Sequence, residues 1–412
     1  MNKEAKFENG EPSGAMEAKQ ERTDVTARLI DMANAGDAFH AEWDDLCQAD
    51  DQASIFLSRR YHEWIAKTNG TFRLLEVRKQ SKLIGLMPLG FKTNWNAELG
   101  RFQTDLIMPG NLFWADYCGY LAHPDWEQEV SRVLGLAVRS LNWNRLYMEN
   151  WDASEVRRDA FLSAFDTPAY KHKFLEISTP DGSANNLICP RLDLPDSFES
   201  YLSGLGRNSR QKLRRLMREF DDGDMVVRSG QQSDIKDIVL LWRERWAEEK
   251  GSKIDDYCQA LAAALTAGIL AGDMSFTVLI SEGKMIGALC HYLDPLRKRA
   301  LFFVGVRDMS LPSSNIGMLL HAIAIQAFIE KGWKTYDFLR GDEEYKFRLG
   351  AKAHDIIFVT VARDPITKMD FNDVSVTDVL SEIPQFIDSG ALDAAKVAAK
   401  QVASVLAMAK QN

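Results

Sequence analysis

The segment 311–350 constrains the fold more than any other part of the chain. Its sequence is LPSSNIGMLLHAIAIQAFIEKGWKTYDFLRGDEEYKFRLG. Between Ile316 and Ile329 the only strongly polar side chains are His321 and Gln326, so we expect a helix that is buried on most of its faces. The following residues, 335–339, have the pattern of a core strand. A buried helix leading into a strand indicates an α/β fold.

A loop rich in ionisable side chains follows this strand without a gap. It contains Arg340, Gly341, Asp342, Glu343, Glu344, Tyr345, Lys346 and Arg348. A core strand rarely leads into so many charged groups unless a site lies there. We therefore expect a functional site in the charged loop, which we define as residues 337–348.

The turn before the buried helix is a candidate anion site. Residues 302–306 are predicted as a strand, and Ser313, Ser314 and Asn315 stand where helix N-caps are favoured, with Gly317 in the first turn. A helix N-terminus offers backbone N–H groups and the positive end of the helix dipole, which suit a pyrophosphate. Because most capped helices bind nothing, this pattern needs support from the surrounding fold.

The totals exclude several classes of protein. The chain has 412 residues and a net charge of −9, which predict two or three domains and argue against a general nucleic-acid binder. Its five cysteines form no CxxC pair, and with seven dispersed histidines they give no metal-ligand spacing. We expect buried thiols, no metal and a cytoplasmic location. No run of 18 apolar residues predicts a transmembrane segment.

Two parts of the chain show the same order of elements. Lys82-Leu83-Ile84-Gly85 matches Lys284-Met285-Ile286-Gly287, each at a turn between two predicted strands. A helix, a tryptophan and a strand then follow at 125–150 and again at 315–339. This order indicates a distant internal duplication. The expected units are a disordered leader 1–24, an N-terminal half 25–190, a C-terminal half 191–369 and a helical tail 370–412.

Other elements complete the expected halves. We predict a helix pair at 25–49, strands near 99–107 and 112–121, and a strand at 355–362 that closes the second half. In the tail, a short helix is expected to end at Pro384. An Ala-rich helix at 391–409 can pack back on the protein, pair with another chain or fray.

Three segments carry a resemblance to a known family. They are YLSGLGRNSRQKLRRLMREF, SSNIGMLLHAIAIQAFIEKGW and YDFLRGDEEYKFRLGA. With them the sequence resembles the GNAT acyltransferase superfamily. It is most similar to the CelD/BcsL-like acetyltransferases associated with cellulose and exopolysaccharide biosynthesis, which are relatives of the FemAB aminoacyl transferases. The resemblance implies an α/β fold of two GNAT-like mixed-sheet halves in tandem, of which the second is better preserved.

The resemblance also implies a co-substrate, acetyl-CoA or another acyl-CoA, lodged between two separating strands. The pyrophosphate would contact the backbone near residues 313–318 and the thioester carbonyl the backbone near residues 304–306. The implied cofactor-binding residues are Val304, Val306, Ser313, Ser314, Asn315, Ile316 and Gly317. Of the glycines in the usual Q/R-x-x-G-x-G/A turn of the superfamily, this chain keeps only Gly317.

The implied chemistry is direct attack of an amine or hydroxyl on the thioester, for which positioning and carbonyl polarisation supply most of the rate. A base takes the proton of the nucleophile, and an acid protonates the departing thiolate. The catalytic candidates are Asp337, Glu343, Glu344, Tyr345 and His291. The candidates for binding an anionic group of a saccharide or small-molecule acceptor are Arg340, Lys346, Arg348, Arg210 and Arg214.

Each candidate has a structural alternative. Asp337 can brace the loop through Arg340 instead of acting as a base. The others can serve the fold as well: Glu343 and Glu344 as a solvated helix start, Tyr345, His291 and His321 as core residues, and the arginine line 207–218 as a solvated helix face.

Three functions therefore stay open. The first is acyl transfer from acyl-CoA to a sugar-type or small-molecule acceptor. The second is FemAB-like aminoacyl transfer from tRNA, which the acidic net charge disfavours and the basic helix 207–220 favours. The third is a non-catalytic accessory protein of polysaccharide biosynthesis. The C-terminal helix is also a candidate contact for a homodimer.

Overall fold

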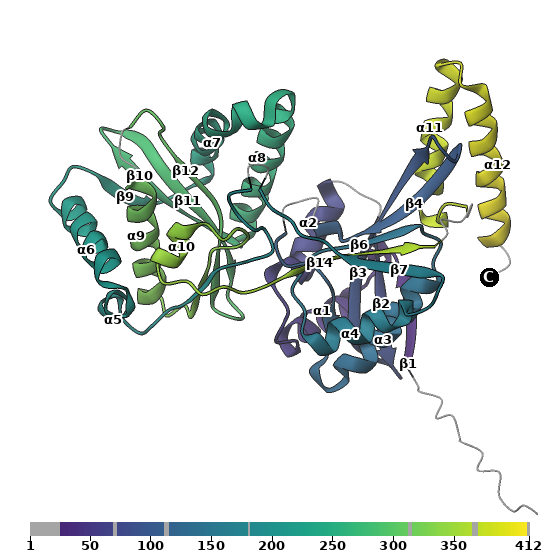
Figure 1. The fold of residues 1–412 in the computed structure, drawn as a ribbon, viewed down its shortest axis with the longest axis horizontal. Coiled ribbons are helices and arrows are strands. Elements are labelled where there is room, and N and C mark those ends of the chain that lie inside the picture. Colours follow the sequence, from purple (N-terminus) through teal and green to yellow (C-terminus); the bar gives the residue numbers. More distant parts are fainter. Residues whose placement is uncertain are drawn as a thin grey trace, which may run out of the picture.

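Two mixed β-sheets lie side by side in the computed structural model, each with helices packed on it (Figure 1). The structure describes residues 25–68, 72–110, 115–179, 182–311, 315–364 and 370–409. The leader 1–24 lies outside the described residues. The predicted fold class, two mixed α/β halves in tandem, is confirmed. Among the described residues, no helix is long and apolar enough to cross a membrane.

The first sheet is built mainly from the N-terminal half. Its strands lie in the order β1 (Val25–Ile30), β2 (Phe72–Lys79), β3 (Lys82–Asn96), β4 (Arg101–Ile107), β6 (Arg145–Trp151), β14 (Ile357–Arg363) and β7 (Tyr170–Phe174), and β5 (Leu121–Ala122) pairs with β3. Only β4 and β6 run parallel. The helices of this half are α1 (Asp37–Ala49), α2 (Arg59–Thr68), α3 (Glu127–Ser140) and α4 (Glu155–Leu162).

The second sheet has helices on both faces. Its order is β8 (Arg191–Asp193), β13 (Thr335–Asp337), β12 (Arg299–Arg307), β11 (Lys284–Asp294), β10 (Met274–Ser281) and β9 (Val226–Ser229). One face carries α5 (Phe198–Gly204), α6 (Arg207–Asp221) and the apolar α9 (Ile316–Glu330), and the short α10 (Glu344–Arg348) follows β13. The other face carries α7 (Ile235–Lys250) and α8 (Ile254–Ala271). Figure 1 shows these two groups of helices on opposite sides of the sheet.

Two expected elements differ from the structure. Residues 25–30 form β1 instead of part of a helix pair, because each residue pairs with β2 in an antiparallel register. Of the expected strand 112–121, residues 115–120 form no strand, and 111–114 lie outside the described residues. Local periodicity did not reveal the long-range pairing that decides these segments.

The C-terminal tail packs back on the first half. α11 (Val376–Asp388) continues through Pro384 instead of ending there, and α12 (Leu392–Ala409) lies against it and against β4. Phe102 of β4, Phe371, Val379, Ala398, Val402 and Val405 form a small buried cluster there. This packing offsets the cost of proline inside a helix, which is about 3 kcal/mol.

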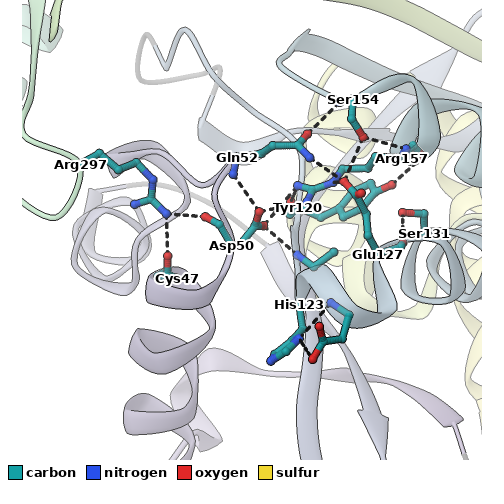
Figure 2. Close-up of polar contacts among 12 residues, drawn as sticks. Cys47, Asp50, Gln52, Tyr120, His123, Glu127, Ser131, Ser154, Arg157 and Arg297 are labelled. Atoms are coloured by element: carbon teal, nitrogen blue, oxygen red, sulfur yellow. Dashed lines mark hydrogen bonds and ion pairs between the residues drawn. The ribbon is translucent and has the colours of Figure 1, made fainter. Parts of the chain in front are cut away.

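The strand expected to close the second half joins the other sheet. β14 lies between β6 and β7 of the first sheet, and Val359 and Val361 are fully buried there. The halves also share a core, in which the rings of Phe56 and Tyr292 lie 5.3 Å apart. Arg297, from the turn between β11 and β12, donates to the backbone carbonyls of Cys47 and Asp50 (Figure 2).

A buried polar network fixes the start of α3 in the first half. The Arg157 guanidinium donates to Asp50 at 3.0 and 3.2 Å and to Glu127 at 3.1 Å, and both members of the Asp50–Arg157 pair are almost completely buried. Gln52 and Ser154 also donate to Glu127 (Figure 2). Glu127 is the first residue of α3, where a negative charge is favoured by the helix dipole.

Candidate active site

The candidate site begins where two parallel strands of the second sheet separate. β12 and β13 pair over three positions only, Arg299↔Thr335, Ala300↔Tyr336 and Leu301↔Asp337. Beyond Leu301, β12 continues to Arg307 and pairs only with β11 on its other side. The register between β11 and β12 also shifts here, because Cys290 faces Val304 while His291 faces Phe302, which leaves Phe303 as an extra bulged residue. The strands thus form the split pair that the sequence resemblance implies.

A cavity of about 360 Å³ opens along this free edge of β12. Residues from both faces of the sheet reach it: Arg245 and Trp246 of α7, Leu289 of β11, Phe302, Gly305, Val306 and Arg307 of β12, Met309, and Gly317, Met318, Leu320, His321 and Tyr345 of α9 and α10. Its size is that of a small-molecule pocket, and most of its lining is apolar, as ligand pockets commonly are. We take this cavity as the candidate active site.

The cavity combines two cations with a helix N-terminus. Arg245 and Arg307 form no ion pair with any described residue, and the Arg245 guanidinium lies 4.7 Å from the centre of the Trp246 ring. α9 begins at Ile316 after the N-cap Asn315, without an acidic residue in its first turn. Gly317 adds space, since a Cβ atom there would meet nothing within 4 Å. Cations and unpaired helix N–H groups together favour an anionic ligand.

A chain of buried hydrogen bonds leads from the cavity into the core. The Tyr336 hydroxyl lies 2.8 Å from Nδ1 of His321 and 2.7 Å from Nε2 of His291. Burial lowers the pKa of His291 to about 3 and holds that of His321 well below its ordinary value, so both imidazoles are neutral near pH 7. Burial also holds the pKa of Tyr336 well above 10, which keeps its hydroxyl protonated.

Tyr345 lines the cavity, with its ring 5.5 Å from the His321 ring. Burial and then the charge of Glu343 raise the pKa of the Tyr345 phenol, so it carries its proton at neutral pH. A protonated phenol in an apolar cavity can donate to a developing anion. Of the five catalytic residues predicted from the sequence, Tyr345 is the one that lines the cavity.

The predicted base Asp337 has its hydrogen-bonding capacity occupied. The fully buried carboxylate accepts hydrogen bonds from the Tyr117 hydroxyl at 2.8 and 2.9 Å, from Arg191 Nε at 2.9 Å and from the Leu339 N–H at 2.9 Å. Its cation partner is thus Arg191 and not Arg340, and its geometry fits the bracing alternative. Arg191 links Asp337 in turn to Asp152 at 2.8 Å, which joins the two halves of the protein.

The charged loop holds itself together. Lys346 is buried, and its ammonium donates to the carbonyls of Arg340 at 2.7 Å and Gly341 at 2.9 Å and pairs with Glu343 at 2.9 Å. Arg340 pairs with Asp116 of the first half. The loop is tightly bent, because Leu339 has a φ of 53°, a value that non-glycine residues rarely adopt. These contacts place Lys346 and Arg340 in the architecture of the loop.

The remaining predicted residues lie at different places. Glu344 and Arg348 form an exposed pair at 2.6 Å along α10. On α6, Arg210 donates to the Ser203 carbonyl at 3.2 Å and Arg214 pairs with Glu199. Val306 and Gly317 line the cavity, and Asn315 is the N-cap residue of α9. Val304, Ile316 and His291 are buried and do not line the cavity. Ser313 and Ser314 lie outside the described residues.

Sequence reasoning missed most residues of the cavity, among them four polar or aromatic side chains, Arg245, Trp246, Arg307 and His321. The sequence does not single out Arg245, Trp246 or Arg307, and it allows His321 to be a core residue. The available signal is His321 itself, the ionisable side chain within the largely apolar stretch 316–329. Nothing local marks Arg245 and Trp246, because they reach the cavity from the opposite face of the sheet. No group of three or more His, Cys, Asp or Glu side chains in the described part of the chain is placed to hold a metal ion.

One known family model matches the region around this cavity. Residues 207–347 match the family model of an acetyltransferase (GNAT) domain. This match runs from the start of α6 into α10 and includes every residue that lines the cavity. It supports an enzyme of the acyltransferase class. No curated protein sequence shows significant similarity to the chain.

FemX shows the same fold over most of the chain, and two further solved structures are similar with lower scores. FemX superposes with a TM-score of 0.55 at 12% identity, covering 78% of this chain and 95% of FemX. A conserved protein of unknown function from Bacteroides thetaiotaomicron gives a TM-score of 0.49 at 12% identity, covering 79% and 97%. A tandem GNAT protein from the clavulanic acid biosynthesis pathway gives 0.45 at 12% identity, covering 83% and 100%. The likeness to FemX extends the shared fold beyond the matched domain into the first half.

Proposed function

We propose that the protein transfers an acyl group from acyl-CoA to an amine or hydroxyl of an acceptor. The observation that carries this proposal is the cavity at the separated ends of β12 and β13. At its edge lie two arginines that form no ion pair with a described residue and the N-terminus of α9, which has no acidic residue in its first turn. A GNAT domain match over the same residues supports acyl-CoA as the co-substrate.

The lining fits the parts of acyl-CoA. The pyrophosphate would bind at the first turn of α9, near Gly317, with Arg245 and Arg307 supplying positive charge. The pantetheine arm would lie along the free edge of β12, where backbone groups beyond Leu301 have no β13 partner. The apolar side chains Phe302, Met318 and Leu320 would exclude water from the thioester. This arrangement needs no glycine-rich turn beyond Gly317.

The proposed reaction is a direct displacement. The acceptor nitrogen or oxygen gives up its proton to a base, for which Glu343 is proposed, and forms a bond to the thioester carbonyl carbon. The carbon–sulfur bond then breaks, and the CoA thiolate takes a proton. Tyr345 is the proposed donor of that proton, because burial keeps its phenol protonated beside the cavity. Among the bases predicted from the sequence, Glu343 lies near Tyr345, since its charge contributes to the raised pKa of the Tyr345 phenol. From the sequence resemblance we further propose a saccharide acceptor in exopolysaccharide biosynthesis.

The test begins with binding and then measures turnover. Isothermal titration with acetyl-CoA should show saturable binding, and release of free CoA thiol should depend on an added amine or sugar. Tyr345→Phe should lower kcat about 10²-fold, the low end of general acid contributions, with an unchanged KM for acetyl-CoA. Arg348→Gln, on the exposed side of the same helix, is the matched control. Absence of binding at millimolar acetyl-CoA would refute the proposal.

The same titration distinguishes the alternatives. The fold shared with FemX keeps aminoacyl transfer as the second candidate, although that likeness concerns the fold alone. Binding of aminoacyl-tRNA without binding of acetyl-CoA would favour that function. Binding of neither, in a folded protein, would favour a non-catalytic accessory role.

A further inference from the structure

The chain of hydrogen bonds behind the cavity joins His321, Tyr336 and His291. Which group donates in each bond depends on where the hydrogens lie. Tyr336 contributes one hydrogen to two hydrogen bonds, one with His321 and one with His291. The second hydrogen must therefore come from one of the two histidines. If His291 supplies it from Nε2, the Tyr336 hydroxyl donates to Nδ1 of His321. If His321 supplies it from Nδ1, the hydroxyl donates to Nε2 of His291.

The far nitrogen of His291 decides between these arrangements. Nδ1 of His291 is buried and has no hydrogen-bond partner among the described residues. A buried N–H without an acceptor is rarer and more costly in folded proteins than an acceptor without a donor. Nδ1 of His291 is therefore the nitrogen without a hydrogen, and the hydrogen sits on Nε2, where Tyr336 accepts it. Tyr336 in turn donates to Nδ1 of His321.

This direction fixes the chemical state of His321 at the cavity. With Nδ1 accepting from Tyr336, the neutral ring carries its hydrogen on Nε2, which has no hydrogen-bond partner among the described residues. His321 is held in place by the Phe302 ring at 4.6 Å and the Tyr345 ring at 5.5 Å. Of its two nitrogens, only Nε2 is left for a ligand in the cavity.

We propose that His321 acts as a hydrogen-bond donor to the thioester carbonyl oxygen, with Tyr336 and His291 as positioning residues that impose the Nε2–H tautomer. This proposal rests on the proposed acyl transfer and adds a donor for the negative charge that forms on the carbonyl oxygen during attack. A preorganised donor in a water-poor cavity is effective because it needs no reorientation during the reaction. His321 is consequently neither the base nor a sealed core residue.

The decisive experiment reads the tautomer directly. Nitrogen-15 spectra of histidine-labelled protein distinguish a protonated from an unprotonated ring nitrogen at each histidine. In the wild type we expect His321 and His291 both to be protonated at Nε2 alone. Tyr336→Phe should convert His321 to a mixture of tautomers, and kcat should fall about 10-fold to 10²-fold, below the full loss of one such donor, with an unchanged KM for acetyl-CoA.

Matched variants separate this role from structural damage. Tyr201→Phe removes another buried hydroxyl of the same core cluster, which donates to the Leu349 carbonyl at 3.0 Å, and should leave the His321 spectrum and kcat unchanged. His321→Gln keeps an N–H group at the end of the side chain and should retain more activity than His321→Leu. Equal activities of these two variants would refute the donor role.

Failure of this proposal differs from failure of the proposed function. Protonation of His321 at Nδ1 in the wild type would overturn the proposal, while acetyl-CoA binding and turnover would still support acyl transfer. Absence of acetyl-CoA binding would overturn both roles in catalysis, even if the expected tautomer were observed.

Discussion

The two halves differ at the point where a pair of parallel strands separates. In each half a helix and a tryptophan precede a strand that pairs in parallel over three positions: β6 with β4 and β13 with β12. In the second half, β12 runs past its partner and a cavity opens. In the first half, Cys118 pairs with Trp151 beside the end of β6, and its N–H donates to the Asn150 carbonyl at 2.8 Å. In the first half, the chain itself thus occupies the position that corresponds to the cavity of the second half.

The helix N-termini differ in the same sense. α3 carries Glu127 and Glu129 in its first turn, and Arg157 holds the Glu127 carboxylate (Figure 2), whereas α9 carries no acidic residue there. A carboxylate from the protein satisfies the positive end of α3, while the first turn of α9 contains no such carboxylate. On the proposed function, the second half has a binding site at the position where the first half has a structural support.

Breaking the buried Asp50–Arg157 pair in the first half should have the largest effect on stability. Asp50→Ala leaves the Arg157 guanidinium buried without its main partner and should lower the free energy of unfolding by about 3–5 kcal/mol. The affinity of the folded protein for acetyl-CoA should not change. Denaturant unfolding and isothermal titration measure the two quantities. Asp44→Ala, which removes an exposed partner of Arg59, should cost about 1 kcal/mol or less.

Giving α9 the negative charge that α3 carries should close the second site. Gly317→Glu has open space for its side chain and should weaken acetyl-CoA binding about 100-fold by repulsion of the phosphates, without loss of stability. Gly317→Gln, of the same size but uncharged, is the matched control. Equal affinities for the two variants would show that the phosphates do not lie at this helix.

The junction between the halves should depend on pH. Although burial opposes it, hydrogen bonding to His354 and the charge of Arg191 lower the pKa of Asp152 from 3.8 to about 2. A lowered pKa stabilises the fold fully above pH 4 and loses its effect as the pH falls to 2. Asp152→Asn should therefore cost about 2 kcal/mol at pH 7 and almost nothing near pH 2, as measured by denaturant unfolding. Asp193→Asn, at an exposed carboxylate, should show no such dependence.

The smallest expected effect is the removal of one cation from the open site. Arg307→Gln should weaken acetyl-CoA binding about 10-fold at low salt and less at high salt, because the interaction with phosphate is screened. Arg299→Gln changes the other end of β12, where the strand is paired with β13, and should bind normally. A salt-independent loss would indicate a packing defect instead of a lost charge.

The sequence predicted elements better than contacts. The apolar pattern of 316–329 correctly predicted α9, since almost every side chain of that helix is buried. The charged loop, by contrast, resembled a site because the sequence does not show which residues bind its charged groups. The Asp337 carboxylate, for example, accepts a hydrogen bond from Tyr117, which lies 220 positions away in the sequence. The cavity residues Arg245 and Trp246 come from a helix with no local signal of its role. Local patterns determine periodicity, whereas these contacts depend on the assembled sheets.

The position of β14 has a consequence for the order of events during synthesis. Because β14 lies between β6 and β7, a nascent chain that ends before residue 357 exposes two unpaired strand edges in its first sheet. Such edges are prone to pairing with other chains. At about 5–20 residues per second, the ribosome needs on the order of ten seconds or more to make the 189 residues between the end of β7 at Phe174 and the end of β14 at Arg363. The first half therefore starts to fold early, but its sheet can be completed only after most of the second half has been made.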